Sequence, residues 1–333
     1  MLFNVLLSGI QKNQDQNSVL SQRLATQKKI LAPSDNVIGT SRAMDYLVRI
    51  NDNNQYQSNI DTATNKLNLT STVLSSFTTM VTQAYGLLNS SLSADTDPIK
   101  QASNSALASQ LRDQFLSLAN DKLGNSYSFS GFKTDQQPYD TNTYAYQGDA
   151  GVINVQIGKN TTVASNVPGS DAFSYTPPAA PYQVKIGNGL NVHYSAGAGT
   201  TVNVEIRDAA DTTVLDTLSF SNVMQMSDLL SSAIGSNDTI RIQALADPFS
   251  KMQDRSQIVL ADVGSRLNSL NDHSSLLADN TNTLEFARTA IQDMNSTDLA
   301  ATGMQLQQVN TILQALYSSA AKILPPSLFD FLK

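Results

Sequence analysis

The sequence predicts an α+β protein: a long antiparallel α-helical bundle or coiled coil formed by the N- and C-terminal parts, with an inserted, mainly β domain. Two observations in the 333 residues predict this class. Toward both ends of the chain, apolar residues recur at steps of three and four, the spacing of a helix that buries one face. In the middle they alternate with polar residues, and clusters of Gly, Pro, Asn and Asp separate the alternating runs.

The clearest helical pattern lies between residues 56 and 88. Its seam positions keep the heptad spacing and are Tyr56, Ile60, Ala63, Leu67, Thr70, Leu74, Phe77, Val81, Ala84 and Leu88. Burial of one Leu or Ile contributes about 1.5–3 kcal/mol, so a seam of this length is enough to hold two helices together. Residues 260–284 repeat the pattern near the other end of the chain, and we expect the two helices to lie side by side.

The first and last segments carry weaker seams. Polar Asn13, Asn17 and Gln27 occupy seam positions near the start, and the run Asn295–Asp298 begins a last helix with residues typical of an N-cap. Isolated helices of this kind are barely stable in water, so we predict that they order when neighbouring subunits cover them. The residues predicted to make these assembly contacts are Leu6, Ile10, Leu20, Leu24, Leu306, Val309, Leu313 and Leu316.

The middle of the chain has the period of β-strands. Alternation predicts strands at 152–158, 201–207 and 238–244, and a short helix at 224–234. The proline-rich run 177–181 is predicted to be a linker. The predicted domains are the terminal assembly helices (1–35 and 295–333), a helical core with a β-hairpin (36–140 and 247–294), and an inserted mainly β domain (141–246) that the run 177–181 would split into two pieces.

Composition argues against several classes of function. Charged residues make up 15% of the chain, the net charge is −7, and no basic run occurs, which disfavours nucleic acid as a partner. There is no cysteine, so a Cys-based zinc site and thiol catalysis are excluded. Asp208, Asp211 and Asp216 lack the spacing of an EF-hand, and neither His193 nor His273 belongs to a catalytic pattern. We therefore predict no enzyme activity, no metal and no cofactor.

The N-terminal sequence lacks a secretory leader. Its apolar residues follow no basic stretch and are interrupted by Asn4 and Ser8, so we predict neither a cleaved signal peptide nor a membrane span. An extracellular location would then require export by a route that removes no leader.

Three stretches resemble members of the bacterial flagellin family, in the same order along the chain. Residues 24–35 resemble the family's motif between its terminal helix and its first core helix. In that motif Pro33 would fix the turn, and Ser34 or Asp35 would cap the next helix. Asn36–Val37 stands where the family usually has Asp–Pro. The other two stretches are the opening of the second core helix, with Tyr56, Asn59 and Ile60, and the returning helix, with Gly264, Arg266 and Leu267.

Further motifs resemble the branch of this family that joins the flagellar hook to the filament. The run Gly124–Thr134 resembles that branch's transition from helix to hairpin, with Gly131 among its residues. Gly124 would end the helix in a left-handed cap, while Tyr127 and Phe129 would point the same way on a strand and pin the hairpin to the bundle. The tail Ser327–Leu332 also resembles this branch.

The resemblance implies a structural subunit at the junction between hook and filament, located outside the cell. The partners it implies are copies of the chain itself, hook-associated protein 1, flagellin, an export chaperone and the type III export apparatus; no nucleic acid or membrane is implied. One alternative is flagellin, the filament subunit. An alternative of another class is a secreted adhesin or carbohydrate-binding module that uses the inserted β region, with the helices as a stalk.

Overall fold

The computed structural model describes residues 2–93 and 97–323, and the chain divides into two compact units. Unit 1 comprises Met1–Gln55 and Ser275–Lys333, and unit 2 comprises Tyr56–Ser274. Two long helices, α2 (Val37–Ser93) and α6 (Thr239–Gln292), contribute residues to both units. Together with the sheets of unit 2, these helices confirm the predicted α+β class. The predicted three-domain boundaries stay a prediction.

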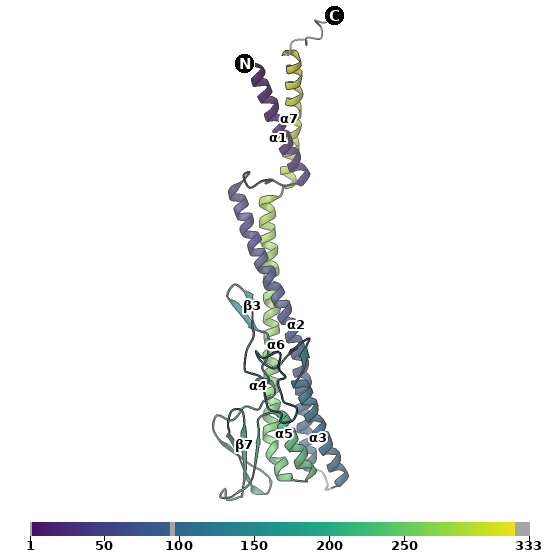
Figure 1. Ribbon diagram of the computed structural model, residues 1–333, viewed down its shortest axis with the longest axis vertical. Helices are drawn as coiled ribbons and strands as arrows, with labels where there is room; N and C mark the ends of the chain where they lie inside the picture. The colour runs from purple at the N-terminus through teal and green to yellow at the C-terminus, as the bar shows by residue number, and fades with distance from the viewer. Residues whose placement is uncertain (1, 94–96, 324–333) are drawn as a thin grey trace. The chain divides into compact units, whose positions relative to one another are not determined.

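Unit 1 consists of helices from both ends of the chain. It contains α1 (Leu2–Thr26), α7 (Ser296–Ile323), the beginning of α2 and the end of α6. Figure 1 shows α1 alongside α7, although residues 27–295 separate them in the sequence. The inner sides of α2 and α6 meet in this unit, where the amide of Asn53 donates to the hydroxyl of Thr281 at 3.1 Å.

Unit 2 combines the remainder of α2 and α6 with shorter helices and three antiparallel sheets. The four-stranded sheet has the order β5-β6-β7-β8, and the other two sheets are hairpins. The additional elements are α3 (Pro98–Ala119), β1 (Lys122–Leu123), β2 (Ser126–Tyr127), β3 (Asn154–Gly158), β4 (Thr161–Ala164), α4 (Gly169–Ala172), β5 (Tyr182–Lys185), a 3₁₀ turn (Gly187–Gly189), β6 (Asn191–Ala196), β7 (Val202–Arg207), β8 (Val214–Phe220) and α5 (Val223–Gly235).

The seam predicted for residues 56–88 is confirmed as the buried face of α2 in unit 2. Every seam position from Ile60 to Leu88 is at most 3% exposed. Helix α6 lies alongside, because the side chains of Gln57 and Ser274 exchange hydrogen bonds of 2.8 and 3.1 Å. The seam thus packs within one chain, as its length and apolar content predict.

Aromatic rings fill the centre of unit 2. Phe173, which follows α4, is fully buried, and its ring centroid lies 4.8 Å from those of Phe77 and Phe129, in edge-to-face geometry. Phe115 of α3 extends the cluster, 5.5 Å from Phe77. Tyr139 closes it at 6.1 Å from Phe173, and its buried hydroxyl donates to the carbonyl of Gly169 at 2.8 Å. Segments from four parts of the chain are therefore joined through Phe173.

The four-stranded sheet buries one face and exposes the other. Val204 and Ile206 of β7 are fully buried, while Asn203 between the strand's first two buried residues is exposed. The hydroxyl of Tyr194 on β6 donates to the carbonyl of Ala244 in α6 at 2.8 Å, which fixes the sheet to the helix. Period-two burial of this kind is what the alternation of residues 201–207 predicts.

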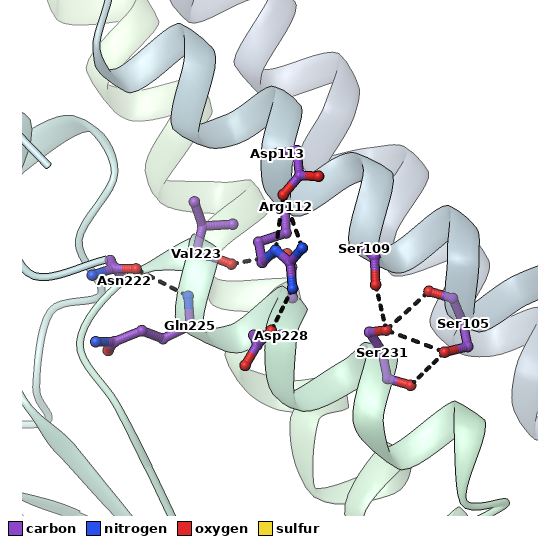
Figure 2. A network of polar contacts seen from close by, with 10 residues as sticks. Ser105, Ser109, Arg112, Asp113, Asn222, Val223, Gln225, Asp228 and Ser231 are labelled. Atoms are coloured by element: carbon purple, nitrogen blue, oxygen red, sulfur yellow. Dashed lines mark hydrogen bonds and ion pairs between the residues drawn. The ribbon is translucent and has the colours of Figure 1, made fainter. Parts of the chain in front are cut away.

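Helix α5 packs against α3 through small and polar residues (Figure 2). The hydroxyl of Ser231 donates to the carbonyl of Ser105 and contacts the hydroxyl of Ser109 at 2.7 Å. Farther along, the guanidinium of Arg112 donates to the carboxylate of Asp228 at 2.6 Å. Small side chains let two helix backbones approach closely, and the serine hydroxyls satisfy one another in the contact.

One predicted strand is wrong. Residues 238–244 form the start of α6, where the backbone N–H of Arg241 donates to the side chain of Asp238 at 3.0 Å, as at a helix N-cap. The alternation of Ile240 and Ile242 resembles a strand over seven residues. The buried residues Ile242, Leu245, Phe249 and Met252 instead follow helical spacing, which a short window does not distinguish from a strand.

The other elements predicted in the middle of the chain are confirmed. Strands β3 and β7 occupy most of the stretches 152–158 and 201–207, and α5 covers 224–234. The family resemblance implied that a second core helix begins at Tyr56. No helix begins there, because α2 runs from Val37 to Ser93 without a break.

Candidate assembly surfaces

Four of the eight residues predicted for assembly pack together between α1 and α7. Leu20, Val309 and Leu313 are buried in one cluster, and Leu306 packs against it. Two polar pairs connect the same helices: the amide of Gln14 donates to the hydroxyl of Tyr317 at 2.7 Å, and Asn17 donates to Asn310. The four other predicted residues, Leu6, Ile10, Leu24 and Leu316, are half-buried.

This pairing shows which element buries the apolar side of each terminal helix. In the structure, α1 and α7 cover each other within one chain, and Asn17 has a partner amide across the pair. The cluster is small, with three buried side chains and a fourth partly buried. A helix pair with so little buried apolar surface is marginal by itself. A role of these residues in contacts with other subunits remains a proposal.

A short antiparallel contact joins the ends of α1 and α6. The backbone N–H of Lys29 donates to the carbonyl of Gln292 at 2.7 Å, and that of Met294 donates to the carbonyl of Gln27 at 2.8 Å. The ammonium of Lys29 lies 2.8 Å from the carboxylate of Asp298. The end of the first helix is therefore tied directly to the start of the last one.

The predicted N-cap of α7 is confirmed and is reciprocal. The side chain of Asn295 accepts from the backbone N–H of Asp298 at 2.8 Å, and the carboxylate of Asp298 accepts from the N–H of Asn295 at 3.2 Å. The hydrogen bond from Lys29 is the largest cause that lowers the pKa of the Asp298 carboxyl.

Acid is expected to loosen this contact. A carboxyl whose pKa is lowered by folding stabilises the fold above its ordinary pKa, 3.8 here, and loses that effect as the pH falls through its folded pKa. We expect amide hydrogen exchange in the first turn of α7 to be unchanged from pH 7 to 5 and to speed up below pH 3.8, after correction for intrinsic rates. Asp298→Asn should already exchange faster at pH 7 and respond less to acid. Asp293→Asn, at an exposed neighbouring carboxyl, should behave like the wild type.

The N-terminus of α2 is capped by neither Ser34 nor Asp35, the two residues predicted for this role. The N-cap is Asn36, whose side chain accepts from the N–H of Gly39 at 2.8 Å. Asp35 instead closes the preceding turn, where its carboxylate accepts from the N–H groups of Leu31 and Ala32 and lies 3.7 Å from Arg23. These backbone hydrogen bonds lower the pKa of Asp35. Neither predicted alternative caps α2; the residue that departs from the family motif does. Pro33 and Ser34 are exposed in this turn.

The run from Gly124 to Gly131 contains the turn and second strand of the β1–β2 hairpin, and it contributes Phe129 to the aromatic cluster. Helix α3 ends at Ala119, so Gly124 does not cap it; Gly124 has a φ of +62° in the turn between β1 and β2. Phe129 is fully buried against Phe173, as the prediction of pinning requires. Tyr127 does not join it, because its ring lies 4.4 Å from the ammonium of Lys122.

Gly131 is required by its backbone conformation and by space. Its φ is +72°, and a Cβ there would lie 2.1 Å from the carboxylate of Asp149. That carboxylate accepts from the N–H groups of Phe132 and Gly151, both at 2.8 Å. A side chain at this position would displace Asp149 from both donors.

Motif residues of α2 and α6 contact the β3–β4 hairpin and the segment that follows it. The amide of Asn59 donates to the carbonyl of Gln156 at 2.8 Å, while Ile60 is part of the buried seam. The guanidinium of Arg266 donates to the carbonyl of Asn166 at 2.9 Å. Gly264 has no neighbouring atom where a Cβ would lie, so nothing in the described chain requires a glycine there. Tyr56 and Leu267 are half-buried. The tail motif 327–332 lies outside the described residues.

A set of exposed apolar residues in unit 1 was not predicted from the sequence. On α2, Val37, Met44 and Val48 share one side of the helix and are 57–70% exposed. On α6, Leu276 and Phe286 are 61% and 78% exposed. A second apolar stripe at heptad spacing, displaced from the main seam, was the signal that could have revealed the α2 residues.

Comparison with known proteins supports the resemblance drawn from these motifs. Residues 1–134 match the family model of the bacterial flagellin N-terminal helical region. Flagellar hook-associated protein 3 of Salmonella typhimurium is 32% identical over 187 residues, which covers 54% of this chain and 58% of that protein. This chain therefore aligns with little more than half the length of that relative. The predicted similarity to the flagellin family, and to this branch of it, is confirmed.

Solved structures share the fold over most of the chain. The crystal structure of Xanthomonas campestris FlgL (space group C2) covers 72% of this chain and 98% of its own, at 18% identity and a TM-score of 0.56. That of the flagellar junction protein FlgL from Legionella pneumophila covers 76% and 100%, at 16% identity and a TM-score of 0.56. The chain thus has the fold of these flagellar proteins. None of its helices within residues 2–93 and 97–323 is long and apolar enough to cross a membrane.

Proposed function

We propose that this chain is a structural subunit of the bacterial flagellum that forms the junction between hook and filament. The observation that carries the proposal is the pairing of the two chain ends as α1 and α7, in a chain with the fold of FlgL. A subunit whose ends fold together can present both terminal helices to its neighbours as one body. A relative that is 32% identical over 187 residues is also named as a hook-associated protein.

The proposed partners follow from the position of such a subunit between the hook and the filament. Such a subunit contacts copies of itself laterally, hook-associated protein 1 on the hook side and flagellin on the filament side. It acts outside the cell without catalysis, and it arrives through the type III export apparatus with the help of a chaperone. The terminal segments 1–35 and 295–333 supply the assembly contacts through the surfaces of α1 and α7.

Deletion of the gene tests this function. The expected result is cells with hooks but no filaments, while flagellin is still exported and accumulates in the medium as monomer. The reason is that flagellin has no layer on which to start the filament. Electron microscopy of the cells and identification of the protein in the supernatant measure both effects, and a plasmid copy of the wild-type gene should restore filaments.

The same experiment separates the alternatives. If the chain were flagellin, the medium of the deletion strain would lack this protein, and wild-type filaments would consist of it. If the chain were an adhesin or carbohydrate-binding module, the deletion strain would have normal filaments. Either outcome would contradict the proposed function.

A further inference from the structure

Helix α6 contains a proline where a helix would ordinarily break. Pro248 is buried inside α6, well after the first residue of the helix, Thr239. A proline in a helix interior removes one hydrogen bond of the helix and usually kinks or breaks it. The buried residues Ile242, Leu245 and Phe249 nevertheless keep helical spacing across the proline. A contact from outside α6 is therefore needed to stabilise the continuous helix.

The four-stranded sheet supplies the hydrogen bond that Pro248 removes. In a regular helix the N–H of residue 248 would donate to the carbonyl of Ala244, four residues earlier. That carbonyl instead accepts from the hydroxyl of Tyr194 on β6 at 2.8 Å, and Tyr194 is fully buried. Burial raises the pKa of Tyr194, so its hydroxyl keeps its proton and acts as the donor. Without this side chain, a buried carbonyl would lack a partner.

A second tyrosine of the sheet engages the residue before the proline. The hydroxyl of Tyr182 on β5 donates to the carboxylate of Asp247 at 2.6 Å, and the ammonium of Lys251 lies 3.0 Å from the same carboxylate. The rings of Tyr182 and Tyr194 are stacked, with their centroids 4.8 Å apart. Two adjacent strands therefore contact α6 on both sides of the peptide bond that lacks a donor.

The dipeptide Asp247–Pro248 has the sequence of a helix start. The same dipeptide begins α3, where the carboxylate of Asp97 accepts from the backbone N–H of Ile99 at 3.0 Å and Pro98 follows it. Aspartate at the N-cap and proline at the first helical position are both favoured at helix N-termini. In α6 the corresponding carboxylate is engaged by the sheet and by the lysine one turn later, so it caps no helix start in the structure.

We propose that α6 has two alternative starts and that the four-stranded sheet selects the longer helix. The observed start is capped by Asp238. In the alternative form the helix begins at Pro248, and residues 239–246 leave it. The two tyrosines favour the long form, because they engage the carboxylate that would cap the short helix and satisfy the carbonyl that the proline leaves free. A binding event or force that draws the sheet away from α6 releases both groups together and shortens the helix. This inference goes beyond the proposed function and does not depend on it.

Amide hydrogen exchange in the purified protein tests the proposal. In Tyr182→Phe/Tyr194→Phe, the amides of residues 243–247 should exchange about tenfold faster than in the wild type, because the short form removes their helical acceptors. Amides of residues 252–260 should keep their rates, since their acceptors lie within the short helix. Adding Pro248→Ala should restore slow exchange, because residue 248 then has an N–H for the carbonyl of Ala244 and no longer favours a helix start.

The matched control is Tyr139→Phe. It removes another buried hydroxyl of unit 2 that donates to a carbonyl at 2.8 Å, but at a site away from the proline. Any faster exchange in this variant should spread over unit 2 instead of concentrating in residues 243–247. Pro248→Ala alone supplies a second measurement that leaves both tyrosines in place. It should slow the exchange of residues 243–247 about threefold relative to the wild type, because it removes the alternative start.

Two results would overturn the proposal. The first is faster exchange of the double tyrosine variant spread evenly over β6, β7 and α6, because the tyrosines would then stabilise only unit 2 as a whole. The second is an unchanged exchange rate of residues 243–247 in Pro248→Ala, which can be measured even if the double tyrosine variant does not fold. Neither result bears on the junction function, which the gene deletion tests separately.

Discussion

Replacing Phe173 with alanine is expected to lower the free energy of unfolding of unit 2 by about 3–5 kcal/mol, because the site cannot collapse around the lost ring. Phe173 is fully buried, and its ring packs against Phe77 and Phe129 at 4.8 Å and against Tyr139 at 6.1 Å. These rings belong to α2, to the segment after β2 and to the segment before β3, and their packing around Phe173 gives each of them a fixed position.

The loss can be measured by thermal unfolding followed by circular dichroism. For a unit of this size we expect the melting temperature to fall by roughly 10 °C. Phe132→Ala is the matched control, since Phe132 is 64% exposed in the same unit and its removal leaves no cavity; it should cost about 1 kcal/mol or less. An equal, small effect of both substitutions would show that the aromatic cluster is not the core of unit 2.

Leu313→Asp is expected to separate α1 from α7 and to abolish assembly without unfolding unit 2. Leu313 is 8% exposed and packs with Leu20 and Val309, the only buried cluster described between the two helices in residues 2–26 and 296–323. A carboxylate there has no partner, and burying an unpaired charge is more costly than so small a cluster can offset. Neither helix is stable alone, so both should unfold.

Three measurements on the purified variant check this result. The helical signal should fall by up to the 25 residues of α1 and the 28 of α7, and trypsin should cleave rapidly at Lys12 and Arg23. The main melting transition, which reports unit 2, should keep its temperature. Gln314→Asp places the same charge on the next, exposed residue and should leave all three unchanged. A large fall of the main transition in Leu313→Asp would show that α7 belongs to the larger core.

The sequence by itself determined the helices, because their signal is periodic over many turns. The heptad seam of residues 56–88 predicted nine buried positions of α2 from Ile60 to Leu88, and all nine are buried. The N-cap at Asn295 is local chemistry between residues three apart, and it too was readable from the chain. The motif resemblance rested on the same local patterns and agreed with the comparison of known proteins.

What the sequence could not determine are features that depend on distant partners. Residues 238–244 alternate like a strand over a short window, but the helix start prevails because Ile242 and the buried residues after it pack at helical spacing against unit 2. The cap of α2 at Asn36 depended on which of three neighbouring polar side chains reaches the N–H of Gly39, and Asp35 turns back toward Arg23 instead.

The tertiary structure also decided which sides of the helices remain free. The seam residues Leu20 and Leu313 were predicted to make contacts between subunits; in the structure they pack in one cluster between α1 and α7 of the same chain. Conversely, Phe286 has no distinguishing sequence context, and only the position of the neighbouring helices shows that it is exposed. Periodicity reports that a face is apolar, whereas burial by a particular partner is a property of three-dimensional packing between residues far apart in the chain.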